Sequence, residues 1–307
     1  MAIERVAIIG LGLLGGSVGL AVRESLPDVA TTGFDADPEV RERARERGLV
    51  QHVAGDAADA VRGADLVILC VPVGAMRKAA EAIAQGLSAH TIISDVGSSK
   101  LRVGKALAET LPGHAVIPAH PVAGTEQSGP DAGFATLFRG RWCILTPSED
   151  ADSAQVETLA SFWRALGSTV EVMDAAHHDM VLAVTSHIPH LIAYTIVGTA
   201  SDLEEVTRSE VIKYSAGGFR DFTRIAASDP VMWRDVFLHN KDAVLDMMAR
   251  FEADLGAMRK AIEAEDGEAM FDLFTRTRAI RRGILEQGQD DARPDFGRMD
   301  HDKESKT

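Results

Sequence analysis

A glycine-rich stretch at residues 10–17, Gly-Leu-Gly-Leu-Leu-Gly-Gly-Ser, constrains this chain more than any other feature. The apolar run at residues 3–9 before it has the length and β-branching of a buried parallel strand, and a helical apolar pattern follows it. In such a strand–turn–helix unit Gly10 permits the tight turn, and Gly12 lets the backbone approach a pyrophosphate. Gly15 lets the helix pack close to the strand. The order of the elements therefore predicts a dinucleotide site rather than a simple glycine-rich turn.

Asp35 is the acidic residue expected to select the cofactor. It lies 20 residues after the last glycine of that motif, at the end of the second predicted strand, where a carboxylate accepts hydrogen bonds from the adenosine ribose. A carboxylate at this place repels a 2′-phosphate, which favours NAD over NADP. The alternative role of a helix N-cap is better filled by Asp37, while the nearby Arg41 and Arg43 weaken the preference for NAD. The other cofactor contacts are expected at the helix start and at the end of the fourth strand: Leu13, Leu14, Val71 and Pro72.

Strands and helices alternate through the first half of the chain. Segments that read as strands lie at 30–35, 50–53, 64–71, 91–94, 115–118, 142–146 and 169–173, and helical patterns between them include 38–47, 74–85 and 153–166. This alternation predicts an α/β fold with a Rossmann-type doubly wound parallel sheet. Because 307 residues suit two domains, we place the dinucleotide-binding domain at 1–173.

The segment 174–200 begins a second half in which the pattern is helical throughout. It is apolar nearly all round, which predicts burial, and Pro189 should kink it. His187 and His190 at its centre argue against a membrane span and share one helix face. They are either satisfied core histidines or parts of a site, and no third ligand at a suitable spacing supports a metal.

The helical half is predicted to continue as two amphipathic helices at 230–251 and 255–284. We therefore expect an all-α domain at 174–287 that carries substrate groups and the dimer contact. The polar, Asp-rich residues 288–307 are expected to form a disordered tail.

Two further polar segments have the composition of a ligand site. His120-Pro-Val-Ala-Gly-Thr-Glu follows a predicted strand and should form a loop on the ligand side of the sheet, as should the Ser-Ser pair at residues 98–99. Taken alone, a loop histidine is more often structural than catalytic. The stretch 217–224, Gly-Gly-Phe-Arg-Asp-Phe-Thr-Arg, offers planar guanidinium groups to a carboxylate, although a solvated charged loop is an equal alternative.

The net charge of the chain limits the classes of molecule that it is expected to bind. The net charge is −14 and the pI is about 5.1, which argues against nucleic acid and against an anionic membrane surface. An anionic substrate therefore needs a local cluster of Arg or Lys. Cys70 and Cys143 lie in apolar strand-like runs and are expected to be reduced and buried, and the N-terminus enters a strand at once without a signal peptide. Both observations favour the cytoplasm.

Four separated blocks together resemble the prephenate/arogenate (cyclohexadienyl) dehydrogenase family. The blocks are residues 10–17, 120–126, 186–190 (Ser-His-Ile-Pro-His) and 217–224, and the resemblance covers about residues 3–285. It implies NAD-dependent oxidative decarboxylation of prephenate to 4-hydroxyphenylpyruvate, of arogenate to tyrosine, or of both, by a homodimer joined through its helical halves. We expect neither a chorismate mutase domain before Met1 nor a regulatory domain after the helices.

The resemblance also implies roles for single residues. His120 matches the catalytic histidine that takes the proton from the ring 4-OH, and Ser99 matches a serine that holds both this histidine and the substrate hydroxyl. Arg224 matches the arginine that binds the substrate carboxylate. The remaining positions line the substrate pocket or support it: Thr125, Glu126, Asp179, His187, His190, Asp221 and Trp233. A histidine base suits neutral pH, so kcat/KM is expected to rise with pH through a group near neutrality.

Two other functions compete with this interpretation. A 3-hydroxyacid or pyrroline-carboxylate dehydrogenase would share both halves but does not account for residues 120–126 together with His187 and His190. A non-catalytic NAD-binding sensor would lack the base or the arginine, and neither is missing here. Prephenate and arogenate differ only at the side chain, where an acidic Glu126 would favour the ammonium of arogenate.

Overall fold

The computed structural model describes residues 3–125, 127–202 and 217–286, and it divides the chain into two compact units, Met1–Met247 and Met248–Thr307. All described strands belong to the first unit. Glu126 and the tail at 288–307 lie outside the described residues, so what the sequence predicts for them stays a prediction. The boundary proposed at 173/174 likewise remains a prediction.

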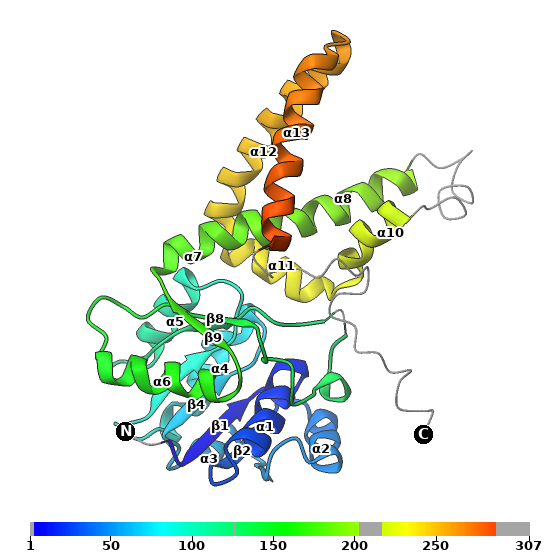
Figure 1. The fold of residues 1–307 in the computed structure, drawn as a ribbon. Coiled ribbons are helices and arrows are strands. Elements are labelled where there is room, and N and C mark those ends of the chain that lie inside the picture. Colours follow the sequence, from blue (N-terminus) through cyan, green and yellow to red (C-terminus); the bar gives the residue numbers. More distant parts are fainter. Residues whose placement is uncertain (1–2, 126, 203–216, 287–307) are drawn as a thin grey trace. The chain divides into compact units, whose positions relative to one another are not determined.

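A six-stranded parallel sheet forms the centre of the first unit (Figure 1). Its order is β3-β2-β1-β4-β5-β6, which is the arrangement of a dinucleotide-binding fold and confirms the predicted doubly wound sheet. The strands are β1 (Arg5–Ile9), β2 (Ala30–Phe34), β3 (His52–Val53), β4 (Leu66–Leu69), β5 (Ile92–Asp95) and β6 (Ala115–Val116). The order reverses direction between β1 and β4, so the carboxyl ends of these two strands define the expected ligand crevice.

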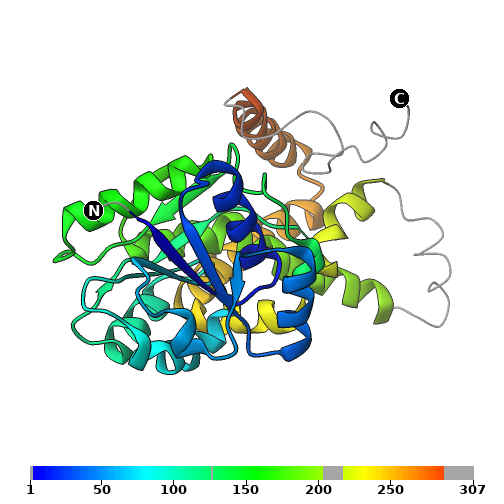
Figure 2. The ribbon, with the colours of Figure 1, turned by 90° about the horizontal axis from the view of Figure 1, so that it is seen from below.

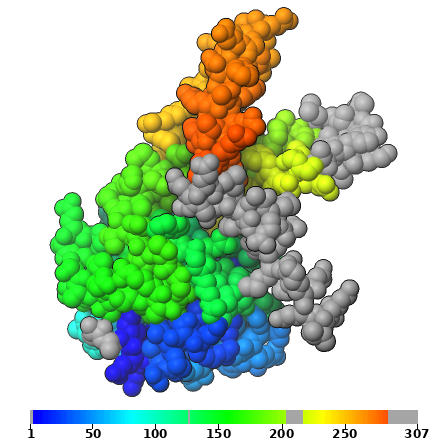
Figure 3. Space-filling view, viewed as in Figure 1, coloured from blue at the N-terminus to red at the C-terminus, as the bar shows by residue number. Residues whose placement is uncertain are grey.

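Helices cover both faces of this sheet because its strands are apolar on both sides (Figure 2). In β1, Val6 and Ile8 pack with one core cluster while Ala7 and Ile9 pack with the other. The first cluster takes side chains from α1 (Leu13–Ser25), α2 (Pro38–Arg47) and α6 (Ser153–Ala165), and the second from α3 (Ala57–Ala60), α4 (Met76–Ile83) and α5 (Leu101–Thr110). Every residue of the inner strands β4 (Leu66–Leu69) and β5 (Ile92–Asp95) is buried. Figure 3 shows the surface of one face of the molecule, coloured along the sequence.

A second, three-stranded sheet follows the first. It consists of β7 (Ala119–Pro121), β8 (Trp142–Leu145) and β9 (Thr169–Val172), with β7 antiparallel and β9 parallel to β8. The prediction that His120 lies in a loop was wrong, because it lies in β7 and pairs with Ile144. The strand is too short for the period-two pattern to reveal it, and it holds the His120 backbone in a sheet.

The long helical segment after β9 is continuous but irregular. Asp174 caps α7 (Ala175–Leu182), a π-helical turn spans Ala183–His187, and α8 (Ile188–Asp202) follows. Pro189 lies in the first turn of α8, directly after the π-helical turn, at the place where the sequence predicts an irregularity. The prediction of complete burial was wrong for the single chain, because Met180, Val184 and Ile196 are between 40% and 52% exposed.

This segment also has the length and hydropathy of a membrane span, which by itself is weak evidence because core helices pass the same test. Its buried positions include His178, Asp179 and His187, which face the protein interior. Polar groups placed in this way indicate that this face of the segment packs within the first unit.

The last helices begin and end elsewhere than the sequence predicts. The structure has α10 (Gly217–Thr223), a 3₁₀ turn at Arg224–Ala227, α11 (Pro230–His239), α12 (Lys241–Glu263) and α13 (Gly267–Glu286). A single helix at 230–251 was wrong because Asn240, which caps α11, uses its side chain to bond other elements. A helix starting at 255 was also wrong: α12 runs through that position and ends before Glu265, whose φ of 51° is left-handed.

Candidate active site

The glycine motif forms a tight cradle between β1 and α1. Gly10 has a φ of 98°, and a Cβ there would lie 2.5 Å from the carbonyl oxygen of Cys70. A Cβ at Gly15 would lie 1.8 Å from the oxygen of Gly10, so only glycine lets α1 approach the strand this closely. Nothing lies within 4 Å of the corresponding position at Gly12. The turn thus leaves open space directly before the helix N-terminus.

The first turn of α1 supplies donors to that space. Its N-cap is Gly12, which offers no side chain to satisfy the N–H groups of Leu13, Leu14 and their neighbours. An uncapped helix N-terminus with adjacent open space suits an anionic pyrophosphate. Val71, which follows β4, lies beside the turn, since its Cγ1 is 3.1 Å from a Cβ placed on Gly10, and the exposed Pro72 follows it.

Asp35 lies at the carboxyl end of β2, and backbone groups fix its carboxylate. Oδ2 accepts from Leu11 N at 2.8 Å, and Oδ1 accepts from Asp37 N at 2.9 Å. Asp37 in turn caps α2, as the sequence predicts. Arg41 donates to the Asp35 carbonyl oxygen rather than to its carboxylate. The carboxylate therefore keeps lone pairs for a ribose hydroxyl, while Arg43 is engaged with Glu46 and Asp131.

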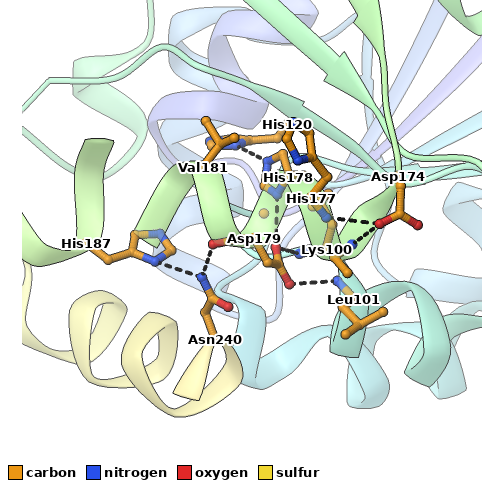
Figure 4. Close-up of polar contacts among 12 residues, drawn as sticks. Lys100, Leu101, His120, Asp174, His177, His178, Asp179, Val181, His187 and Asn240 are labelled. Carbon is orange, nitrogen blue, oxygen red and sulfur yellow. Dashed lines mark hydrogen bonds and ion pairs between the residues drawn. The ribbon is translucent and has the colours of Figure 1, made fainter. Parts of the chain in front are cut away.

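His120 is buried, and another histidine holds it. Its Nδ1 lies 2.9 Å from Nε2 of His178, and the two rings meet edge to face (Figure 4). Burial lowers the pKa of His120 well below its ordinary value, and the neighbouring His178 and Lys100 act in the same direction. The imidazole is therefore neutral at pH 7. The lowered pKa of His120 moves the expected acid limb of kcat/KM to lower pH than a group near neutrality would give, and the pH profile itself stays a prediction.

Asp179 connects the start of α7 to the loop after β5. Its Oδ1 accepts from Lys100 N at 2.7 Å and from His178 Nδ1 at 2.9 Å, and its Oδ2 accepts from Leu101 N at 3.0 Å. Asn240 Nδ2 donates to the Asp179 carbonyl oxygen at 2.8 Å (Figure 4). One carboxylate thus fixes two backbone groups and a histidine ring within the first unit.

Lys100 and Asp95 form an ion pair with both side chains fully buried. Lys100 Nζ also donates to the carbonyl oxygen of Ala119, the residue before His120, at 2.6 Å. Asp95 further accepts from Gly97 N at 2.8 Å. Burial raises the pKa of Asp95 and lowers that of Lys100, while each charge opposes the shift of the other. The pair therefore ties β5 to β7 and so positions the backbone that carries His120.

The expected hydrogen bond from Ser99 to His120 is absent: among the described residues, Ser99 Oγ is buried without a partner. His187 Nε2 and Trp233 Nε1 share this state. Asn240 Nδ2 donates to His187 Nδ1 at 3.0 Å, so the neutral ring carries its proton on the unpartnered Nε2. Burial lowers the pKa of His187 to about 4, which keeps it neutral. These three residues are all members of the site expected from the sequence.

An aromatic cluster joins the predicted pocket residues of α8 and α11. The ring of His190 stacks on Trp233 with centroids 3.7 Å apart, and His187 meets the same indole edge to face at 6.0 Å. His190 Nδ1 donates to the Ser186 carbonyl oxygen at 2.8 Å, which leaves its Nε2 as an acceptor. The prediction that the two histidines share one helix face is confirmed by their common contact.

Arg224 begins the 3₁₀ turn that packs with α10 against α8. It is exposed. Burial lowers the pKa of His190 and the Arg224 charge adds to this lowering, which is consistent with a guanidinium near the aromatic cluster. Asp221 on α10 is exposed. Thr125 is also exposed, and its Oγ1 accepts from Gln127 N at 3.2 Å. Glu126 lies outside the described residues, so its predicted role is not tested.

Sequence reasoning missed His178, Lys100 and Asn240. His178 directly precedes Asp179 but belongs to none of the blocks that carry the family resemblance. A His-His-Asp run at the start of a helix is also typical of a solvent-exposed first turn. Lys100 is fully buried, which is rare for a lysine unless it is paired, and no local sequence pattern predicts this burial. The one available signal was that Lys100 follows the small polar residues at the end of a parallel strand.

The fold and site together define a two-domain dehydrogenase that binds a nicotinamide dinucleotide. The family model of the prephenate dehydrogenase nucleotide-binding domain matches residues 18–172, and that of the prephenate dehydrogenase dimerization domain matches residues 174–276. The chain belongs to the prephenate dehydrogenase family. This excludes the 3-hydroxyacid and pyrroline-carboxylate alternatives.

Similar proteins cover almost the whole chain. A cyclohexadienyl dehydrogenase of Zymomonas mobilis is 45% identical over 92% of this chain and 96% of its own length. A prephenate dehydrogenase of Bacillus subtilis is 34% identical over 92% of this chain and 76% of its own. The crystal structure of prephenate dehydrogenase from Aquifex aeolicus with hydroxyphenyl propionate and NAD⁺ has a TM-score of 0.86 at 33% identity, covering 92% of this chain and 99% of that one.

Proposed function

We propose that this protein catalyses the NAD-dependent oxidative decarboxylation of prephenate, of arogenate, or of both, in tyrosine biosynthesis. Membership of the prephenate dehydrogenase family supports an oxidoreductase, and the similar proteins act on, or are named for, these cyclohexadienyl acids. The glycine cradle, the uncapped α1 N-terminus and the fixed carboxylate of Asp35 fit NAD. The bound cofactor supplies a hydride acceptor for ring carbon C4.

The chain's own groups handle the proton and the orientation of the substrate. His120, buried and neutral, takes the proton of the 4-hydroxyl as the hydride leaves C4, and the ring becomes a dienone. Loss of the ring carboxylate as CO₂ sends an electron pair to the ring oxygen, which recovers the proton from His120. Aromatisation drives this last step, so the reaction needs no further electron sink. Arg224 is proposed to hold a substrate carboxylate.

The observation that carries this proposal is that three of the buried side-chain atoms without partners in the described part of the chain belong to the expected site, on Ser99, His187 and Trp233; the others are on Ser94, His114, Thr146 and Trp163. Burying a polar group without a hydrogen bond costs roughly 1–3 kcal/mol, so such atoms concentrate where a ligand completes them. Ser99 precedes Lys100, whose backbone N–H donates to Asp179, while the rings of His187 and Trp233 belong to the aromatic cluster. A hydroxylated ring with two carboxylates offers acceptors for these donors.

We also propose a homodimer joined through the helical halves. Residues 174–276 match a dimerization domain model. In the first unit, α7 and α8 expose Met180, Val184, Ile196 and Val197, and in the second unit α12 and α13 expose Leu255, Ile262, Phe271, Phe274 and Ile280. Apolar faces of this extent require a cover. A cytoplasmic location is consistent with the free thiols of Cys70 and Cys143.

The decisive experiment follows NADH absorbance with purified protein, NAD and either prephenate or arogenate. Turnover of at least one substrate with release of CO₂ is expected, and the ratio of kcat/KM values ranks the two. A hydroxyacid without the cyclohexadienyl ring serves as the control and should give no NADH. Absence of turnover with both substrates, in protein that still binds NADH, would refute the proposed function.

A further inference from the structure

We propose that His178 is a positioning residue that, with Asp179, fixes the tautomer of His120 so that its Nε2 is the base. This inference rests on the proposed function for its catalytic meaning, but its structural content is independent of the substrate. None of the blocks that mark the family contains His178, which is fully buried on α7.

Asp179, His178 and His120 form a chain of two hydrogen bonds, and the donor in each bond can be worked out by starting from the Asp179 carboxylate. Both oxygens of Asp179 accept from backbone N–H groups, so this side chain serves as the acceptor in its contacts. His178 Nδ1, 2.9 Å from Asp179 Oδ1, must therefore carry a proton. In a neutral ring the other nitrogen then has a lone pair, so Nε2 of His178 is an acceptor.

The same logic extends to His120. Its Nδ1 lies 2.9 Å from the acceptor Nε2 of His178, so it must donate, and the proton of the neutral His120 ring is on Nδ1. The lone pair is consequently on Nε2, the nitrogen that has no partner within this chain of contacts (Figure 4). The alternative, a charged His178, would place the His120 proton on Nε2 and leave no base there.

The surroundings favour the neutral form of both rings. Burial lowers the pKa of His178 and of His120, and Lys100 nearby acts in the same direction on both. Asp179 opposes the shift at His178, as does the more distant Asp95, and His187 adds to the lowering at His120. The backbone of the network is fixed as well, since Lys100 bonds Ala119 beside His120 while Asn240 bonds the carbonyl of Asp179.

The same hydrogen-bonded relay of His120, His178 and Asp179 also stabilises the positive charge that forms when His120 takes up a proton. Once Nε2 of His120 takes the hydroxyl proton, the imidazolium donates through Nδ1 to His178, whose own N–H points at the Asp179 carboxylate. Each hydrogen bond then becomes charge-assisted and stronger than in the resting state. Without His178 the His120 ring is free to adopt the other tautomer, in which Nε2 bears hydrogen and accepts nothing.

The first test reads the tautomer without any substrate. In protein labelled with ¹⁵N-histidine, long-range ¹H–¹⁵N spectra distinguish the protonated from the lone-pair nitrogen, with His120 and His178 assigned by the loss of signals in His120→Asn and His178→Gln. We expect His120 and His178 both with hydrogen on Nδ1. A wild-type His120 with hydrogen on Nε2, or a doubly protonated His178 at neutral pH, would overturn the proposal, whether or not prephenate is turned over.

The second test reads catalysis. His178→Phe, which removes the acceptor, should lower kcat by ~10²–10⁴, the range known for lost general-base function and for wrong-tautomer variants, with KM for NAD unchanged. His178→Gln, whose Oε1 replaces the acceptor at Nε2, should recover much of that loss. A merely structural role predicts no rescue by Gln and an altered NADH affinity.

The matched control is His177→Phe, because His177 is the exposed neighbour of His178 on α7 and its side chain has no part in the network. It should keep wild-type kcat. If His178→Phe retains wild-type kcat while wild-type protein turns over prephenate or arogenate, the relay is refuted and the proposed function stands. If the wild-type protein turns over neither, the proposed function fails and the spectra alone decide the tautomer.

Discussion

Replacing Lys100 with Met should destabilise the first unit strongly, because it leaves a buried carboxylate without its cation. Lys100 and Asp95 are both fully buried, and Met fills a similar volume without charge or donor. Removing one partner of a buried ion pair costs about 3–5 kcal/mol. For a unit of this size each kcal/mol moves the melting temperature by about 2–4 °C, so a decrease of about 6–20 °C is expected.

The pH dependence of that loss has a definite sign. Burial raises the pKa of Asp95, and Lys100 is the main group that opposes the rise. In Lys100→Met the folded-state pKa of Asp95 therefore lies further above the unfolded value of about 4. Above that pH the unfolded carboxyl ionises while the folded one stays protonated, so the variant loses stability as pH rises. The deficit relative to wild type should be larger at pH 8 than at pH 5.

Thermal and urea unfolding of wild type and variant at the two pH values measure this. The double variant Lys100→Met/Asp95→Asn should recover much of the stability, because a neutral amide needs neither a cation nor a bound proton in the buried site. Arg62→Met, which breaks the exposed pair of Arg62 with Asp59, serves as the surface control and should have a much smaller effect. A Lys100→Met protein as stable as wild type, or a deficit that shrinks as pH rises, would refute the reasoning.

Four further outcomes are expected. His120→Asn should keep NADH binding but lower kcat by ~10²–10⁴, and a near-wild-type rate would remove His120 from the mechanism. Because Asp35 ends β2, kcat/KM should be higher with NAD than with NADP, and equal use of NADP would contradict this. Light scattering at micromolar concentration should give a dimer that covers the apolar faces of α7 and α8, and a stable monomer would contradict it. Glu126→Gln should selectively lower kcat/KM for arogenate, which corresponds to a loss of about 1–3 kcal/mol in transition-state stabilisation. An equal loss with both substrates would assign Glu126 a structural role only.

The sheet was predictable because its information is local. The strands β1 and β4 are mostly apolar runs, and the glycine motif marks the point at which the first strand meets its helix. Even the N-cap of α2 follows from Asp37 before Pro38. The strand β7 was not predictable, because three residues show no period and its pairing with β8 depends on a distant segment.

The site divides along the same line. Some site residues follow from spacing along the chain. The glycine motif at Gly10 and the acidic Asp35 stand at the separation typical of a dinucleotide-binding unit, and the three-residue spacing of His187 and His190 puts both on one helix face. The contacts that tie His178 and Lys100 to the site reach residues 58 and 19 positions away in sequence, His120 and Ala119. Asn240 is similar, since the residue at which α11 ends bonds α7 and His187, 61 and 53 residues away in sequence. Spacing on one element does not encode such long-range pairs.

The arrangement around His120 reconciles two opposing electrostatic demands. A base must be deprotonated before it acts, and burial together with the Lys100 charge ensures this by lowering the pKa of His120. A low pKa alone would make a weak base, because the charged form it must reach is disfavoured. The Asp179 carboxylate stands one histidine away, so it contributes little to the resting ring and most when the positive charge forms on His120. An interaction that strengthens as the proton moves lowers the barrier, whereas one already complete in the resting state would not.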